Sequence, residues 1–114
     1  GILSRVHRNY QVYKKDVISK ILREKRQVIP CLAGRFHLVV WPEGDVSPCE
    51  LLPPVGNIRE ESLERLLNGL KMKKAVSSIR NGDCFCTHDC NMVENVLFNP
   101  KTYWKLLVPR KNAK

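Results

Sequence analysis

Residues 83–90 read Asp83-Cys84-Phe85-Cys86-Thr87-His88-Asp89-Cys90 and hold three of the chain's five cysteines. The other two cysteines lie far upstream. Cysteines that serve only as small hydrophobic core residues are not expected to gather within seven positions. Thiolates collected in one loop are typical of a zinc site or an iron–sulfur cluster. The spacing therefore predicts a metal centre, for which the candidate ligands are Cys31, Cys49, Cys84, Cys86 and Cys90.

A disulfide framework is the other common use of several cysteines in a small domain, and two features disfavour it. Five is an odd number, and the N-terminal residues lack the basic, then apolar, then small pattern of a secretory signal. No apolar run approaches the roughly 18 residues that a transmembrane helix needs. We therefore expect a cytoplasmic protein with reduced thiols and no membrane segment.

The length of the chain limits its function. Its 114 residues amount to one domain, too little for a complete catalytic barrel of about 250 residues. It begins at Gly1 rather than at methionine, so we expect a piece of a larger protein. No nucleophile–base pair stands at informative spacing, and no catalytic residue is predicted.

The net charge of +9 comes from the two ends of the chain. Residues 31–70 carry three basic and six acidic residues, whereas both flanking segments are strongly basic. The basic residues of segment 10–27 recur at helical spacing, without the interleaved aromatic residues of an RNA-binding sheet. This pattern favours a solvated helix face, and nucleic-acid binding is not expected.

The predicted secondary structure is a small β-hairpin followed by short helices. Residues 10–27 have the period of an amphipathic helix, and Phe36–Trp41 and Val46–Cys49 are expected to pair as strands across a turn at 42–45. Cys31 and Cys49 then fall at the two ends of the hairpin, close enough to share a metal. Helices are expected over 63–70, 72–79 and 93–98, and a last one after Asn99. The predicted class is α+β, with these elements arranged around a cysteine-ligated metal cluster.

Three further segments extend the cysteine pattern into a family resemblance. They are Cys31-Leu32-Ala33-Gly34, Gly44-Asp45-Val46-Ser47-Pro48-Cys49, and Gly56-Asn57-Ile58-Arg59 followed by Ser62-Leu63. With the late cysteine cluster they resemble, in the same order, the auxiliary iron–sulfur domain at the C-terminus of many radical SAM enzymes, the SPASM/twitch family. The resemblance covers roughly residues 31–98.

The resemblance implies a [4Fe–4S] cluster in a domain that follows a barrel binding S-adenosylmethionine. Such a domain assists the binding of substrate, often a peptide or protein, or passes electrons. Residues 1–30 would be the connector helix from the upstream barrel, 31–98 the iron–sulfur domain, and 99–114 a C-terminal helix with a basic tail. These limits are expectations from the resemblance.

The resemblance also implies a ligand set. Full members of the family carry seven or more cysteines and two clusters, so the five cysteines here indicate a single-cluster form. Cys31, Cys49 and Cys90 match positions that share a cluster, and Cys86 is the expected fourth ligand. Cys84 is the expected spare, able to exchange with Cys86.

The cradle for S-adenosylmethionine is missing from this chain. It needs three cysteines spaced C-x3-C-x2-C, and Cys86-x3-Cys90 is followed by Val93 at the third position. We therefore expect the cofactor only in the parent enzyme, and no activity of the chain alone.

A structural zinc module that contacts nucleic acid is the alternative interpretation. Four thiolates suit zinc as well as an iron–sulfur cluster. However, zinc sites of this kind favour C-x2-C pairs, which Cys84-x-Cys86 does not match. His88 is expected to lie near a sulfur or in solvent rather than to replace a thiolate ligand.

Overall fold

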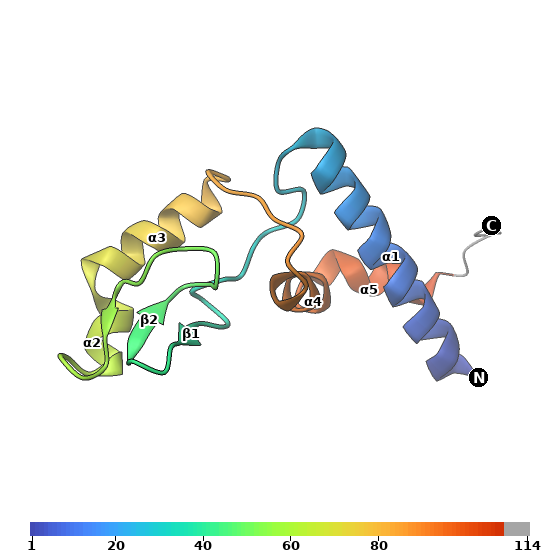
Figure 1. The fold of residues 1–114 in the computed structure, drawn as a ribbon. Helices are drawn as coiled ribbons and strands as arrows, with labels where there is room; N and C mark the ends of the chain where they lie inside the picture. The colour runs from blue at the N-terminus through green and yellow to red at the C-terminus, as the bar shows by residue number, and fades with distance from the viewer. Residues whose placement is uncertain (109–114) are drawn as a thin grey trace. The chain divides into compact units, whose positions relative to one another are not determined.

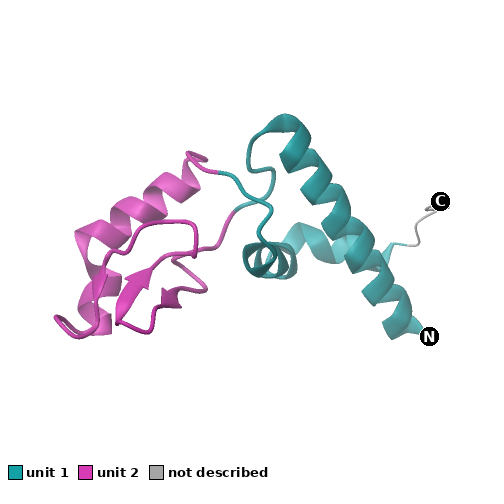
Figure 2. Ribbon diagram, in the orientation of Figure 1, with its two compact units in different colours: residues 1–30, 85–114 teal, residues 31–84 magenta. Residues whose placement is uncertain are grey.

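A computed structural model describes residues 1–108 of the chain, and the predicted basic tail, residues 109–114, lies outside the described residues. The described elements are, in order (Figure 1), α1 (Ile2–Glu24), β1 (Val39–Val40), β2 (Asp45–Ser47), β3 (Gly56–Asn57), α2 (Leu63–Asn68), α3 (Leu70–Arg80), α4 (Asp89–Leu97) and α5 (Pro100–Leu107). This content confirms the predicted α+β class. The chain divides into two compact units (Figure 2): unit 2 is Cys31–Cys84, and unit 1 combines Gly1–Pro30 with the chain from Phe85 onward.

The sheet of unit 2 contains the predicted hairpin. β1 and β2 pair antiparallel, with Val40 opposite Val46, and the turn between them contains Gly44 at a φ of 96°. A β-carbon at Gly44 would lie 2.7 Å from Asn57 Oδ1, so the turn requires glycine both for its backbone angle and for space. β3 pairs with the other edge of β2, which gives the order β1-β2-β3.

Two short helices complete unit 2. Ser62 begins α2 as the predicted N-cap, since its side chain accepts a hydrogen bond from the Arg65 backbone N–H at 3.3 Å. After α2, the chain turns at Gly69 into α3, which ends at Arg80 before Gly82 at a φ of 77°. Both helices bury apolar side chains against the sheet in one core cluster, Val46, Val55, Leu66 and Met72.

Unit 1 is helical. α1 begins at Ile2, eight residues before the predicted start, and its apolar stripe packs against α4 in a core of Val17, Ile21, Ile29, Met92 and Val96. Buried Asn9 donates a hydrogen bond from Nδ2 to the Leu106 carbonyl at 2.9 Å, which joins α1 to α5. α5 begins as predicted: the Asn99 side chain accepts from the Lys101 N–H at 3.1 Å, and Pro100 occupies the first turn.

Candidate metal centre

Cys31 and Cys49 come together in unit 2, although β1 begins only at Val39, so that Cys31 lies in the loop before the hairpin rather than at its end. Buried Cys49 forms an apolar cluster with Ala33 and Ile79, and the side chain of Cys31 packs against this cluster. Cys49 is only 6% exposed, whereas Cys31 is half-buried. Folding of unit 2 therefore brings two thiols 18 residues apart in sequence into one apolar environment. Their role as metal ligands stays a prediction.

The end of β2 fixes the position of Cys49. The Trp41 indole N–H donates to Ser47 Oγ at 3.1 Å, which joins the two strands immediately before the cysteine. Pro48 is fully buried, and beyond Cys49 the Leu52 N–H donates to the Cys49 carbonyl at 3.3 Å. The cysteine thus lies in a turn whose backbone is held on both sides.

The backbone of the loop after Cys31 is also held by hydrogen bonds. The backbone N–H groups of Arg35 and Phe36 both donate to the Leu32 carbonyl at 3.0 Å. The Arg35 guanidinium Nη2 donates to the Cys31 carbonyl, also at 3.0 Å. A side chain four residues along the chain therefore holds the backbone of a candidate ligand.

Cys84 belongs to the same apolar cluster as Cys31 and Cys49. It follows α3 through a turn in which Asp83 accepts a hydrogen bond from Ser78 Oγ at 2.7 Å, and its half-buried side chain packs against the cluster of Ala33, Cys49 and Ile79. The structure therefore brings three of the five candidate ligands together within unit 2. The status of Cys84 as the spare thiol stays a prediction.

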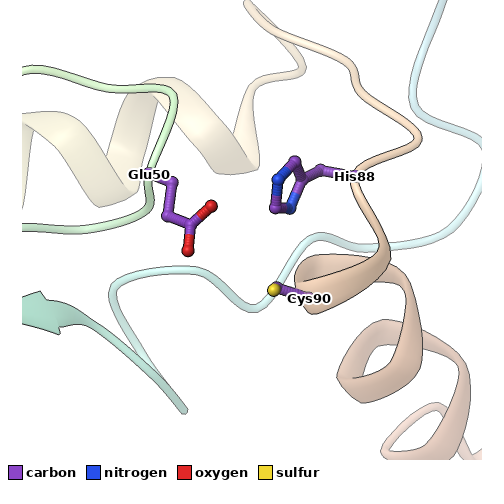
Figure 3. Close-up of side chains that lie close together, drawn as sticks. All are labelled: Glu50, His88 and Cys90. Atoms are coloured by element: carbon purple, nitrogen blue, oxygen red, sulfur yellow. The ribbon is translucent and has the colours of Figure 1, made fainter.

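Cys86 and Cys90 belong to unit 1, at the start of α4. The helix begins at Asp89, four residues earlier than predicted, so Cys90 lies in its first turn rather than in a loop. His88 is the N-cap residue, and Figure 3 shows the side chains of His88 and Cys90 at this end of the helix, with Glu50, the residue after Cys49, also drawn.

Cys86 has a hydrogen-bond donor of its own. The Asn91 side-chain Nδ2 lies 3.5 Å from Cys86 Sγ, and Asn91 is only 3% exposed. A buried amide that donates to sulfur is a common feature of iron–sulfur sites. Sequence analysis missed this residue, because an asparagine five positions after a cysteine forms no recognisable motif.

An ion pair ties the start of α4 to α1. Lys14 Nζ lies 2.8 Å from Asp89 Oδ1, and the hydrogen bond to this carboxylate raises the pKa of Lys14 above its ordinary value of 10.5. Asp89 also lies in the first turn of α4, where the helix dipole favours a negative charge. Together these interactions fix the helix end from which Cys90 projects.

The residues present fit an iron–sulfur cluster. None of the five cysteines forms a disulfide within the described residues, and three of them lie among apolar side chains that limit the access of water. Thiolate sulfur is the ligand that iron–sulfur clusters require, and apolar surroundings with N–H donors to sulfur set their potentials. Within residues 1–108, no helix is long and apolar enough to cross a membrane.

Comparison with known proteins agrees with this chemistry. Residues 31–91 match the family model of SPASM, described as an iron–sulfur cluster-binding domain, and the chain belongs to this family. The family is the one that its motifs indicate, the auxiliary domain of radical SAM enzymes.

Among individual proteins, the chain is similar to the antilisterial bacteriocin subtilosin biosynthesis protein AlbA of Bacillus subtilis (strain 168). The two are 35% identical over 72 residues, a match that covers 54% of this chain but only 16% of the relative. No solved structure matches the chain.

Proposed function

We propose that this chain is an auxiliary domain that binds one [4Fe–4S] cluster in a radical SAM enzyme. The proposed ligands are Cys31, Cys49, Cys86 and Cys90, with Cys84 as the spare thiol. The observation that carries the proposal is the packing of Cys31 and Cys49, free thiols 18 residues apart, in one apolar environment within a matched iron–sulfur family.

The role proposed for the domain is to assist substrate binding or electron transfer in the parent enzyme. An iron–sulfur cluster supplies one-electron chemistry when bound. The chain's own residues hold the thiolates in place, keep water from Cys49, and supply a hydrogen-bond donor to Cys86. Binding of S-adenosylmethionine is assigned to an upstream barrel, because this chain lacks the three-cysteine cradle.

A peptide or protein is the proposed substrate class. The relative is named for the biosynthesis of a bacteriocin, and bacteriocins are themselves peptides or proteins. The cytoplasm is the proposed location, because reduced thiols are maintained there.

Redox behaviour separates the proposal from a zinc module. The chain, reconstituted without oxygen with iron and sulfide, is expected to be brown, to bleach on reduction with dithionite, and to give the electron paramagnetic resonance signal of a reduced cluster. A zinc protein is colourless and gives no such signal. A reconstituted chain that neither bleaches nor gives the signal would contradict the proposal.

Replacing Asn91 by leucine is expected to lower the reduction potential of the cluster. The reduced cluster carries more negative charge on its sulfurs, so loss of the N–H donor to Cys86 destabilises the reduced state more than the oxidised state. A difference of about 1 kcal/mol in this hydrogen bond corresponds to about 40 mV for one electron. Redox titration monitored by electron paramagnetic resonance measures the shift.

Asn91→Gln is the matched control, because it keeps an amide donor and is expected to recover part of the potential. The iron content of each variant is determined first, so that loss of the cluster is not mistaken for a shift. An iron-replete Asn91→Leu variant with the wild-type potential would show that Asn91 has no influence on the cluster.

A further inference from the structure

A hollow on the surface of unit 2 is lined by basic and apolar side chains and by none of the cysteines. It has a volume of about 570 Å³ and lies along α3, between that helix and the loop after Cys31. We call it the basic hollow, and its lining residues are Gly34, Arg35, Leu67, Met72, Lys73, Val76, Ser77, Arg80 and Asn81.

The lining of the basic hollow is positively charged, although unit 2 as a whole has equal numbers of basic and acidic residues. Unit 2 contains seven basic and seven acidic residues, so the excess charge of the chain lies outside it. The hollow nevertheless gathers Arg35, Lys73 and Arg80 without one acidic residue in its lining. Within the described residues, no ion pair is recorded for these three side chains, and all three are exposed. Arg35 donates one hydrogen bond to the neutral Cys31 carbonyl, which leaves its charge uncompensated, so the charge of all three side chains is available to a negatively charged ligand.

Apolar side chains and a close backbone approach form the rest of the hollow. Leu67, Met72 and Val76 supply the apolar part of the lining. A β-carbon at Gly34 would lie 2.9 Å from Val76 Cγ2, so the loop approaches α3 this closely only because residue 34 is glycine. This approach places Arg35 beside the helix that carries the other two cations.

The spacing of the cations suits an extended chain. Lys73 and Arg80 are seven residues apart on α3 and share one face, about 10.5 Å apart along the helix axis at 1.5 Å per residue. A peptide in the extended polyproline II conformation has three residues per turn and advances about 3.1 Å per residue, so positions i and i+3 share one face and lie about 9.3 Å apart, close to this distance. Carboxylates at positions i and i+3 of a bound peptide would meet the two cations, and the residues between them would meet the apolar surface.

We propose that the basic hollow binds an acidic peptide segment in which two carboxylates flank apolar residues. Nucleic acid fits this site less well, because its lining has no aromatic side chain on which a base could stack. The inference goes beyond the proposed cluster function, and it depends only on side chains of unit 2, whichever metal the cysteines bind.

The test is a binding measurement with a defined probe. A fluorescein-labelled peptide Gly-Glu-Leu-Leu-Glu-Gly is titrated with the full, anaerobically reconstituted chain at low salt, and fluorescence anisotropy is recorded. Saturable binding is expected, and the combined variant Arg35→Ala, Lys73→Ala, Arg80→Ala is expected to raise the Kd at least about tenfold through loss of three ionic contacts. Added salt is expected to weaken wild-type binding.

A matched control removes the same charge elsewhere. The combined variant Lys15→Ala, Lys20→Ala, Arg23→Ala takes three cations from α1 and is expected to change the Kd less than about twofold. The single variants Lys73→Ala and Arg80→Ala leave the Arg35 hydrogen bond to the Cys31 carbonyl in place and put a good helix former at exposed positions of α3. They therefore report on binding even if the combined variant folds poorly or loses iron.

Several results would overturn the inference. They are equal weakening in the α1 control, equal binding of the uncharged peptide Gly-Gln-Leu-Leu-Gln-Gly, and no binding up to about 1 mM chain. Tighter binding of a thymidine oligonucleotide that depends on the same three cations would assign the hollow to nucleic acid instead. Iron content is assayed in the same samples, so a failure of the cluster proposal is recognised separately.

Discussion

The Cys49→Ser variant is expected to retain almost no iron after anaerobic reconstitution. Serine keeps the size of the side chain but removes the sulfur, and Cys49 is the most buried of the five candidate ligands. Loss of a group that merely orients a ligand already costs about 10–100-fold in metal affinity, and loss of the ligand itself costs more. Iron and sulfide analysis of the purified variant measures the effect.

The same substitution is expected to lower thermal stability. In a domain this small, the free energy of metal binding is also free energy of folding, so a variant that cannot bind the cluster loses that contribution. The expected result is a lower melting temperature for Cys49→Ser than for the reconstituted wild type, measured by circular dichroism without oxygen.

Ile79→Val provides the packing control, because Ile79 is buried in the same apolar cluster as Cys49. Loss of one methyl group is expected to cost about 0.5–1.5 kcal/mol without loss of iron. If Ile79→Val loses as much iron as Cys49→Ser, packing rather than ligation explains the result. An iron-replete Cys49→Ser chain would remove Cys49 from the ligand set.

The second large effect is expected on iron content, and it distinguishes a ligand role of Cys86 from one of Cys84. Cys86→Ala is expected to empty the site, whereas Cys84→Ala is expected to keep the full iron content. The reasons are the hydrogen bond from Asn91 to Cys86 Sγ and the short separation of Cys86 from Cys90, four residues along the chain. Parallel reconstitution of the two variants, followed by iron analysis and redox titration, compares them directly.

The opposite outcome has a structural basis as well. Cys84 packs against the same apolar cluster as Cys31 and Cys49, so it is the thiol placed to exchange with Cys86. An empty Cys84→Ala variant together with a full Cys86→Ala variant would reverse the assignment. It would also remove the basis for an effect of Asn91 on the potential.

The parts of the fold predicted correctly from sequence are those set by local chemistry. The hairpin follows from β-branched residues on both sides of a turn that needs Gly44, and α5 follows from Asn99 and Pro100 at its start. Local signals were sufficient for these two elements, since tertiary packing agrees with them. The proximity of Cys31 and Cys49 was expected from a longer hairpin, whereas in the structure β1 begins at Val39 and the preceding loop, with its bridge between Ala33 and His37, leads back to Cys31.

The features that sequence analysis missed depend on contacts between distant residues. β3 consists of Gly56 and Asn57, both poor strand formers, and its pairing is reinforced by the Asn57 amide donating to Asp45 Oδ1 at 3.1 Å. The early start of α4 at Asp89 is accompanied by the ion pair with Lys14, 75 residues away in sequence. No local pattern contains such partners.

The candidate site also has a part that could be predicted from sequence and a part that could not. Its ligand types were evident from cysteine spacing, whereas the donor to Cys86 and the place of Cys84 beside Cys49 required the folded chain. The basic hollow was likewise not predicted, because Arg35 and Arg80 are 45 residues apart in sequence and line one hollow only in the folded chain, where the loop at Gly34 approaches α3.

The most direct test of the central claim is the amount of iron and acid-labile sulfide bound per chain after anaerobic reconstitution. A single [4Fe–4S] cluster predicts about four irons and about four sulfides per chain, with Mössbauer parameters of that cluster type. One zinc per chain, bound in preference to iron and without sulfide under the same conditions, would contradict it.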